Sequence, residues 1–184
     1  MTLETNPDDP RDTDASLAAA SQRGDRSAFE SLVRRTARLL FARLYLDTSG
    51  DAHRAEDLVQ ETYLLAWRRV RELNDPAKFR PWLMQIGRSV LLDSAKRDAR
   101  KKRSAPRGAN DAVEEVRDRS TATPSESASR NEGRRRAIAA LQSLPEEYRL
   151  PLTLRYLADA DDETISKQLA LSNGALRGLL QRGM

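Results

Sequence analysis

A short loop in this chain places amide, carboxylate, ammonium and aromatic side chains next to one another. It begins at Asn74 and reads Asn-Asp-Pro-Ala-Lys-Phe-Arg. The side chains of Asn74 and Asp75 can bond to base edges, and Lys78 can bind a phosphate. Phe79 and nearby Trp82 can stack on a base, which returns roughly 1–3 kcal/mol and is comparable with the few kcal/mol that unstacking costs. The loop is a candidate site for an unpaired nucleotide. The alternative, that the two rings are buried and fasten the loop to a core, stays open and is favoured for Trp82.

A basic segment follows the loop at the end of an amphipathic pattern that begins near Pro81. Six basic residues and one acid lie between Lys96 and Arg103. The polar face of this predicted helix carries Gln85, Ser89, Asp93, Lys96, Arg97 and Arg100. Such a face can bind a phosphate backbone through counterion release. A solvated helix can show the same charges, so the segment alone is weak evidence for phosphate binding. The adjacent loop strengthens that interpretation.

The helix predicted before the loop, over residues 52–73, has apolar residues on two faces. One face is expected in the core and carries Val59, Tyr63, Ala66, Val70 and Leu73. The opposite face carries Asp57, Gln60, Leu64, Trp67 and Arg71. Aromatic anchors among polar groups are typical of interface hot spots. Trp67 therefore either forms part of a partner surface or covers the neighbouring helix, and the pattern does not separate the two.

Hydrophobic periodicity predicts an all-α protein made of two small helical domains. Residues 1–14 are acidic, contain two prolines and are expected to be a disordered leader. Residues 15–104 form the first predicted domain and residues 131–184 the second. Between them, residues 105–130 are rich in Ser, Thr and charge and poor in large aliphatic side chains. That composition predicts a flexible linker.

The second predicted domain ends in a helix–turn–helix pattern over residues 162–182. Its expected core consists of Ile165, Leu169, Leu171, Leu176 and either Leu179 or Leu180. Ser172 suits the N-cap of the last helix, and the first residues of such a helix meet base edges in the major groove. The residues suited to DNA contact are Ser172, Asn173, Arg177, Gln181 and Arg182. A plain three-helix bundle would show a similar pattern.

Composition argues against several other classes of protein. The 184 residues include no cysteine and one histidine, His53. The lack of cysteine excludes disulfides, thiol catalysis and cysteine-based metal sites. A catalytic or di-metal reading would need His53 with Glu56, Asp57 and Glu61, and a bundle metal site requires a second motif of that kind. We therefore expect no catalysis, no cofactor and no metal.

The chain also has no pattern that directs it to a membrane. Charged residues make up 33% of it and the mean hydropathy is −0.71. No apolar run approaches the eighteen or so residues that a membrane span requires. The first residues lack the basic start and apolar stretch of a signal peptide. We therefore expect a cytoplasmic protein without membrane insertion.

Both halves of the chain resemble bacterial extracytoplasmic-function (ECF) sigma factors of the sigma-70 family. Residues 55–67 read Ala-Glu-Asp-Leu-Val-Gln-Glu-Thr-Tyr-Leu-Leu-Ala-Trp, and residues 79–89 read Phe-Arg-Pro-Trp-Leu-Met-Gln-Ile-Gly-Arg-Ser. These segments resemble region 2 of that family. The Leu-Pro-Glu-Glu-Tyr-Arg motif at residues 144–149 and the helix–turn–helix are similar to region 4. Two departures are Ala170 and Leu179, which replace a turn glycine and a DNA-facing arginine of the family pattern.

The resemblance implies that the protein joins core RNA polymerase and reads the −10 and −35 promoter elements. It assigns polymerase contact to Asp57, Gln60, Glu61, Leu64 and Trp67. It assigns the −10 element to Asn74, Asp75, Lys78, Phe79, Ser89, Asp93, Lys96 and Arg97. It assigns the −35 element to Ser172, Asn173, Arg177, Gln181 and Arg182.

Two further expectations concern partners. Many members of that family are restrained by an anti-sigma protein, so a partner of that kind is expected although the sequence does not identify one. The alternative function is that of a stand-alone helix–turn–helix regulator that binds duplex DNA and does not join polymerase. That alternative explains residues 145–182 but leaves the Trp67 face and the aromatic loop without a use.

Overall fold

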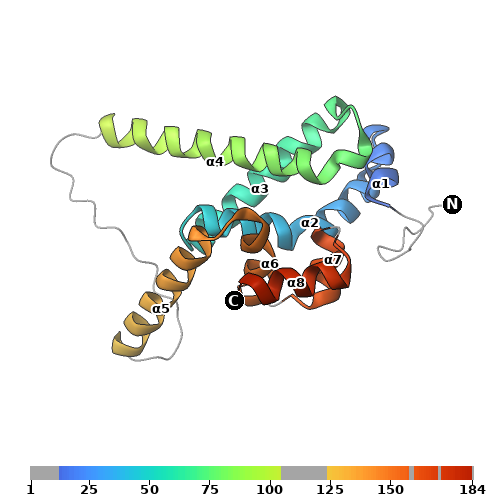
Figure 1. Cartoon of the computed structure of the whole chain (residues 1–184). Helices are drawn as coiled ribbons and strands as arrows, with labels where there is room; N and C mark the ends of the chain where they lie inside the picture. The colour runs from blue at the N-terminus through green and yellow to red at the C-terminus, as the bar shows by residue number, and fades with distance from the viewer. Residues whose placement is uncertain (1–12, 105–123, 158–159, 170, 184) are drawn as a thin grey trace.

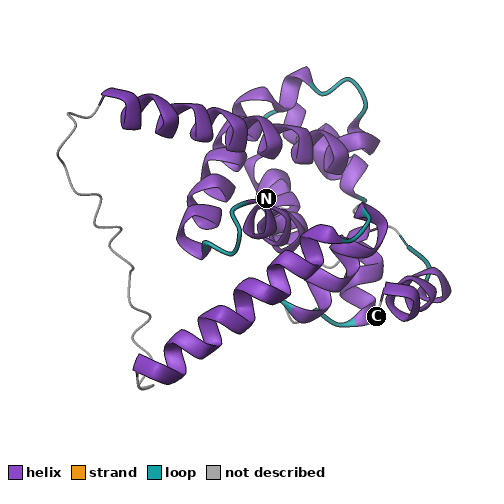
Figure 2. Cartoon of the chain, turned by 60° about the vertical axis from the view of Figure 1, so that its left-hand side comes forward, coloured by secondary structure: helices purple, strands orange, loops and turns teal. Residues whose placement is uncertain are grey.

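The computed structural model describes residues 13–104, 124–157, 160–169 and 171–183, which form helices joined by short turns (Figures 1 and 2). These residues contain no strand. The all-α class predicted from hydrophobic periodicity is therefore confirmed. Within the same residues, no helix is both long and apolar enough to cross a membrane.

The first group of helices runs from residue 14 to residue 104. It consists of α1 (Asp14–Gln22), α2 (Arg26–Asp47), α3 (Ala52–Arg69), the 3₁₀ turns Val70–Glu72 and Pro76–Lys78, and α4 (Phe79–Ser104). The first three helices begin after Thr13, Asp25 and Asp51, whose side chains accept backbone hydrogen bonds at 2.9–3.1 Å. Such caps satisfy N–H groups that have no partner within the helix.

Residues 1–14 were expected to form a disordered leader, but helix α1 begins at the last of them. Asp14 is the first residue of a helix, and its carboxylate accepts a hydrogen bond from Arg80 Nε at 2.5 Å. Residues 1–12 lie outside the described part of the chain, so the rest of the leader stays a prediction.

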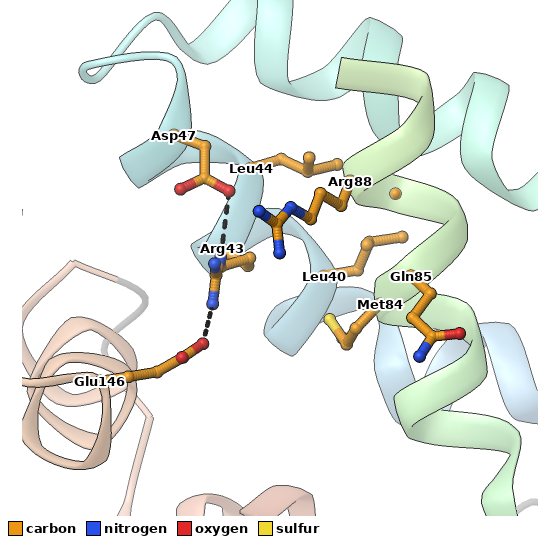
Figure 3. A pocket seen from close by; sticks show the side chains of 9 residues that line it. Leu40, Arg43, Leu44, Asp47, Met84, Gln85, Arg88 and Glu146 are labelled. Carbon is orange, nitrogen blue, oxygen red and sulfur yellow. Dashed lines mark hydrogen bonds and ion pairs between the residues drawn. The ribbon is translucent and has the colours of Figure 1, made fainter. Parts of the chain in front are cut away.

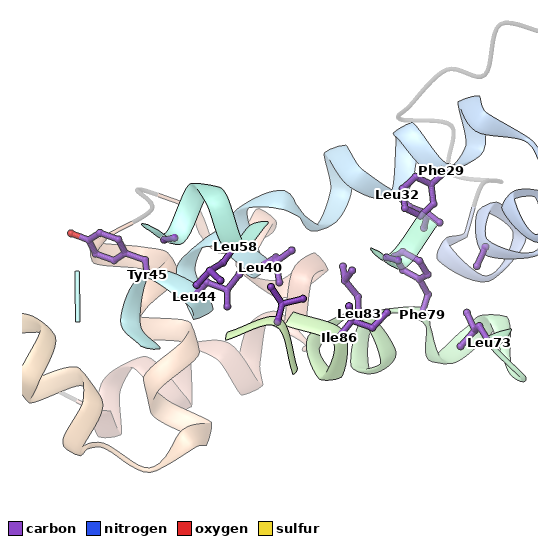
Figure 4. Packing of buried hydrophobic residues seen from close by; sticks show 14 of the residues in the cluster. Phe29, Leu32, Leu40, Leu44, Tyr45, Leu58, Leu73, Phe79, Leu83 and Ile86 are labelled. Atoms are coloured by element: carbon purple, nitrogen blue, oxygen red, sulfur yellow. The ribbon is translucent and has the colours of Figure 1, made fainter. Parts of the chain in front are cut away.

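The core of this bundle lies where α2, α3 and α4 meet (Figure 4). On α3 the buried residues are Ala55, Leu58, Thr62 and Ala66. Three residues of the expected stripe, Ala66, Val70 and Leu73, are buried as predicted. Val59 and Tyr63 are only half-buried, and Leu58 and Thr62 are buried instead, because α3 is covered by both α2 and α4. Tyr63 is half-buried, and its hydroxyl lies 2.9 Å from Thr36 Oγ1. Burial raises the pKa of the Tyr63 phenol to about 12.

Phe79 differs most from its predicted role. Its side chain is fully buried, with 0% exposure. The ring lies edge-on to Phe29, with centroids 6.4 Å apart, and 5.9 Å from the ring of the half-buried Trp82. The expectation that Phe79 stacks on a DNA base is therefore corrected, because its ring offers no exposed face. Phe79 instead fastens the loop to the core.

The second group of helices consists of α5 (Pro124–Ser143), α6 (Glu146–Tyr156), α7 (Asp162–Leu169) and α8 (Asn173–Gly183). The expected linker, residues 105–130, is shortened at one end because α5 begins at Pro124. Residues 105–123 lie outside the described part. The buried side chains of this group include Leu152, Leu154, Ile165, Leu176 and Leu180. Of the two alternatives at the last core position, Leu180 is the buried one, and Leu179 is half-buried.

The two groups of helices are in contact with each other. Leu39 and Ala42 of α2 belong to the same buried cluster as Leu152 and Leu154 of α6. Ile138 of α5 belongs to the core of the first group and is only 2% exposed. Figure 1 shows α6 and α7 beside α2, while α4 and α5 extend outward. The fold therefore brings together two groups that the sequence predicted as separate domains.

Truncation of Phe79 should destabilise the protein rather than remove a DNA contact. We expect Phe79→Ala to lower the free energy of unfolding by about 3–5 kcal/mol, because it leaves a cavity at the fastening point of the loop. Phe79→Leu should cost less, since it keeps most of the buried volume. Urea denaturation monitored by circular dichroism measures both. Normal stability of Phe79→Ala would show that the ring is not a core residue.

Candidate nucleic-acid and partner interface

The exposed face of α3 gathers most of the residues predicted to contact a protein partner. Asp57, Gln60, Leu64 and Trp67 are exposed and follow one another at steps of three and four residues, so they share one face. Leu64 is 61% exposed, although α3 buries its opposite face. The fifth predicted residue, Glu61, is half-buried beside them.

Trp67 fits both interpretations of its role, as a cover for the neighbouring helix and as part of a partner surface. Its ring centroid lies 5.0 Å from that of Phe29, so one side of the indole covers α2. The side chain is nevertheless 36% exposed. It also lines a hollow of about 260 Å³ together with residues of the α1–α2 turn and the end of α3, namely Ser21, Gly24, Arg68, Val70 and Arg71. A half-exposed indole at the edge of a hollow is suited to anchoring a partner.

The loop between α3 and α4 is held at both ends. Leu73 is buried, and its carbonyl oxygen accepts a hydrogen bond of 2.5 Å from Gln22 Nε2. At the other end Phe79 is buried, as described above. Between these two points Asn74 and Lys78 are exposed. A loop fixed in this way presents its polar side chains with little loss of conformational entropy on binding.

Asp75 has a structural role within this loop. Its Oδ1 accepts a hydrogen bond from the Ala77 backbone at 3.0 Å, which caps the 3₁₀ turn Pro76–Lys78. Its Oδ2 lies 3.8 Å from Lys78 Nζ. The carboxylate predicted to read a base is thus already engaged with the backbone. Asn74 is left as the loop residue better suited to reading a base edge.

The face of α4 that was predicted to follow a nucleic-acid backbone is exposed at Ser89, Asp93, Lys96 and Arg97. Lys96 Nζ lies 3.5 Å from an oxygen of Asp93, one turn away. Both cations are more than half exposed in their side chains. The face can therefore offer two positive charges to phosphates, each with a nearby carboxylate.

An ion pair joins the α4 face to the α3 face. One terminal nitrogen of Arg97 donates to both carboxylate oxygens of Glu61, at 3.1 and 2.9 Å. The hydrogen bond that Arg97 donates to Glu61 raises the pKa of Arg97. A second pair, between Arg54 and Asp98 at 2.7 Å, joins the same two helices further along. The sequence assigned Glu61 and Arg97 to different partners, and the structure brings them together.

Arg80 is a residue of this region that the sequence analysis did not single out. Directly after the loop, its Nε donates to Asp14 of α1 and a terminal nitrogen donates to the carbonyl oxygen of Gln168 in α7 at 2.8 Å. Asp14 also lies 3.6 Å from Arg35 of α2. These partners are 66 and 88 residues away from Arg80 in the chain. No local pattern could have indicated them.

The helix–turn–helix presents its predicted residues on the surface. Ser172, Asn173, Arg177, Gln181 and Arg182 are all exposed. The Ser172 hydroxyl accepts a hydrogen bond of 3.2 Å from the Ala175 backbone, which confirms its predicted role as the N-cap of α8. Asn173 Oδ1 accepts a hydrogen bond of 3.0 Å from Ser166 Oγ, which ties the start of α8 to α7.

The described residues hold no group of three His, Asp or Glu side chains that could bind a metal ion. Their chemistry is that of two adjoining surfaces, one apolar and one basic, with a fixed loop between them. Such surfaces serve binding.

Comparison with known proteins identifies the family. Residues 27–101 match the family model described as Sigma-70 region 2. The chain is 32% identical over 181 residues to the ECF RNA polymerase sigma factor SigE of Mycolicibacterium smegmatis, with 95% of this chain and 67% of that protein covered. It is 28% identical over 140 residues to the ECF RNA polymerase sigma factor SigM of Bacillus subtilis, with 76% and 81% covered.

Two other matches are a relative, RfaY, and a solved structure, CnrH. The probable RNA polymerase sigma factor RfaY of Xanthomonas campestris pv. campestris is 34% identical over 137 residues, and the match spans only 34% of that relative. A solved structure of CnrH in complex with the cytosolic domain of CnrY is 25% identical, with a TM-score of 0.46 and with 94% of this chain and 92% of that chain covered. Because a relative of at least 30% identity is matched along nearly the whole of this chain, the chain belongs to the ECF sigma factors of the sigma-70 family.

Proposed function

We propose that the protein binds bacterial core RNA polymerase and directs promoter recognition, strand opening and transcription initiation. One observation carries this proposal. The exposed Leu64–Trp67 face, the fixed loop and the basic face of α4 adjoin one another on one rigid bundle. A duplex-binding regulator has no use for an apolar face and an anchored loop beside its basic helix. The similarity to proteins named as RNA polymerase sigma factors supports the same function.

In this proposal the exposed face of α3 holds polymerase. Trp67 is the anchor, Leu64 adds apolar area, and Asp57, Gln60 and Glu61 supply the polar rim. An anti-sigma protein is a further proposed partner, because any protein that covers the same exposed face excludes polymerase from it.

The loop and α4 hold the separated strand of the −10 element. Asn74 reads a base edge, while Lys78, Lys96 and Arg97 attract phosphates. Ser89 and Asp93 lie on the same exposed face and are further proposed contacts with the strand. Since the loop binds only unpaired bases, its binding energy shifts the promoter toward the open form.

The helix–turn–helix reads the −35 duplex through the exposed residues of α8 and its cap. Arg177 and Gln181 lie one turn apart on one face, which suits them to neighbouring positions in the major groove. Sigma factors are generally non-enzymatic regulators of transcription, so the chemistry of RNA synthesis is assigned to polymerase. The site of action is then the cytoplasm.

Reconstituted transcription separates the proposal from the stand-alone regulator. Purified protein added to bacterial core polymerase should form a complex and produce transcripts from promoters of its own genome. A regulator would bind duplex DNA without polymerase and yield no transcript. Absence of both a core complex and promoter-specific transcripts would therefore reject the sigma function and favour the regulator.

Trp67→Ala should weaken binding to core polymerase by about tenfold to thirtyfold, as expected for the loss of an aromatic hot spot worth about 1.4–2 kcal/mol. Leu92→Ala is the matched control, because Leu92 is 52% exposed but lies on α4. Fluorescence anisotropy of labelled protein titrated with core measures both affinities, and circular dichroism confirms folding. Equal affinities for the two variants would reduce Trp67 to a packing residue.

Asn74→Ala and Lys96→Ala should change DNA binding in different ways. With holoenzyme and single-stranded −10 oligonucleotides, Asn74→Ala should lose about tenfold of the preference at one base, because a side chain that reads a base edge is removed. Lys96→Ala should weaken all oligonucleotides alike and reduce the salt slope by about one. If Asn74→Ala gives only a uniform loss across sequences, the loop does not read a base.

A further inference from the structure

Helix α1 lies against the loop between α3 and α4 (Figure 1). It contacts both 3₁₀ turns of that loop and α4. Leu17 and Ala18 of α1 are buried in the same cluster as Leu73 and Phe79, the two buried ends of the loop. The match to Sigma-70 region 2 begins at residue 27, so α1 precedes it. The contacts that α1 makes with the loop therefore need an explanation of their own.

The last residue of α1 holds the point where the chain leaves α3. Gln22 Nε2 donates to the carbonyl oxygens of Val70 at 3.2 Å and of Leu73 at 2.5 Å. Carbonyl groups at the end of a helix have no partner within it, and one amide carries two N–H donors. Gln22 thus satisfies two backbone groups and fixes the start of the loop.

The first residue of α1 holds the point where the chain enters α4. The Asp14 carboxylate accepts a hydrogen bond of 2.5 Å from Arg80 Nε and lies 3.6 Å from Arg35 of α2. The side chains of Asp14 and Arg80 are only 21% and 22% exposed, so their attraction is screened less than that of a surface pair. A carboxylate in the first turn also suits the helix dipole.

One short helix therefore sets the spacing of both ends of the loop. Asp14 and Gln22 are the first and last residues of α1, which puts their Cα atoms about 12 Å apart. The backbone from Leu73 to Arg80 could extend over about 23–25 Å. The loop is held well short of that length, and the 3₁₀ turn Pro76–Lys78 takes up the slack.

We infer that α1 is a brace for the loop and that Gln22 and Asp14 are positioning residues for base recognition. They act on DNA through the placement of Asn74 and not by contact with it. A hydrogen bond to a base edge weakens steeply when its angle changes, whereas attraction of a phosphate depends less on direction. The role in base recognition rests on the proposed function, and the brace itself is a property of the free chain.

Hydrogen exchange of the full free chain tests the brace without any activity. Gln22→Met keeps most of the side-chain volume and removes both N–H donors. The peptide covering residues 70–79 contains the Leu73 and Lys78 amides, which donate to the carbonyls of Val70 and Asp75 at 3.3 and 2.9 Å. It should exchange about threefold to tenfold faster in this variant, because one or two hydrogen bonds that close the loop are lost.

Gln142→Met is the matched control for that measurement. The Gln142 amide also donates to a carbonyl at the end of a helix, that of Leu46 in α2, at 2.6 Å. It makes the same kind of bond as Gln22 but at a different place in the fold. Its loss should leave exchange over residues 70–79 at the wild-type rate. Equal exchange of this peptide in the two glutamine variants would overturn the brace.

Asp14→Ala gives a second route that does not depend on the tolerance of Gln22. It removes the acceptor of Arg80 and should speed exchange over residues 70–79 at least about twofold. Asp47→Ala is its control, because it removes an acceptor of Arg43 at 3.0 Å in another part of α2 (Figure 3). Wild-type exchange of the peptide in Asp14→Ala would overturn the role of Asp14.

Base preference tests the positioning role. With holoenzyme and single-stranded −10 oligonucleotides, Gln22→Met should lose about threefold of the preference at the base that Asn74 reads. In an Asn74→Ala background the same change should cost no further preference, because Gln22 acts through Asn74. Gln22→Lys restores N–H donors and should recover the preference. An additive loss in the double variant, or a uniform loss across sequences, would reduce Gln22 to a packing residue.

The outcomes distinguish this inference from the proposed function. Faster exchange in Gln22→Met with an unchanged base preference would overturn the positioning role and leave the sigma function intact. Absence of promoter-specific transcripts with wild-type protein would reject the sigma function. The exchange measurements decide the existence of the brace in either case.

Discussion

The ring of Phe29 lies between two other aromatic rings, and the positions of both candidate surfaces depend on it. Trp67, the anchor of the exposed α3 face, lies 5.0 Å from it, and Phe79, which holds the end of the loop, lies 6.4 Å from it and edge-on. Aromatic pairs of this kind add about 0.5–1.5 kcal/mol beyond the area they bury. Because one ring supports both neighbours, a partner that moves Trp67 also acts on the support of the loop.

The ion pairs between α3 and α4 give the two surfaces a second connection. Glu61 holds Arg97 with both carboxylate oxygens, so Arg97 approaches a phosphate only by sharing or leaving that carboxylate. Exposed pairs of this type contribute little to stability, typically about 0–1 kcal/mol. Their effect is on position and charge. In the proposed function, a partner that binds Glu61 would release Arg97 for DNA, which would couple polymerase binding to strand binding through a single carboxylate.

Sequence patterns predicted the parts of this structure that depend on near neighbours. Ser172 was recognised as a cap because its partner lies three residues away. Phe79 was predicted to contact DNA because a local sequence pattern does not show that its ring packs against Phe29, which is distant in the chain. The Arg80–Asp14 bond joins residues 66 apart, and no periodicity reports it. Helix α5 extends into a polar, serine-rich segment whose composition predicted a linker. Composition does not report that Ile138 of the same helix packs on the first bundle and supports the helix from outside.

In the proposed function, the docked arrangement leaves an asymmetry between the two DNA readers. In the docked chain Asn173, Arg177 and Gln181 of the helix–turn–helix remain exposed, whereas the end of the −10 loop is joined to α7 through Arg80. In the proposed function, duplex DNA can therefore meet α8 while the C-terminal helices stay docked on the first bundle. A separated strand that draws Arg80 toward its phosphates must compete with Asp14 and the Gln168 carbonyl. In the proposed function, docking of α7 on Arg80 therefore affects the −10 step more than the −35 step.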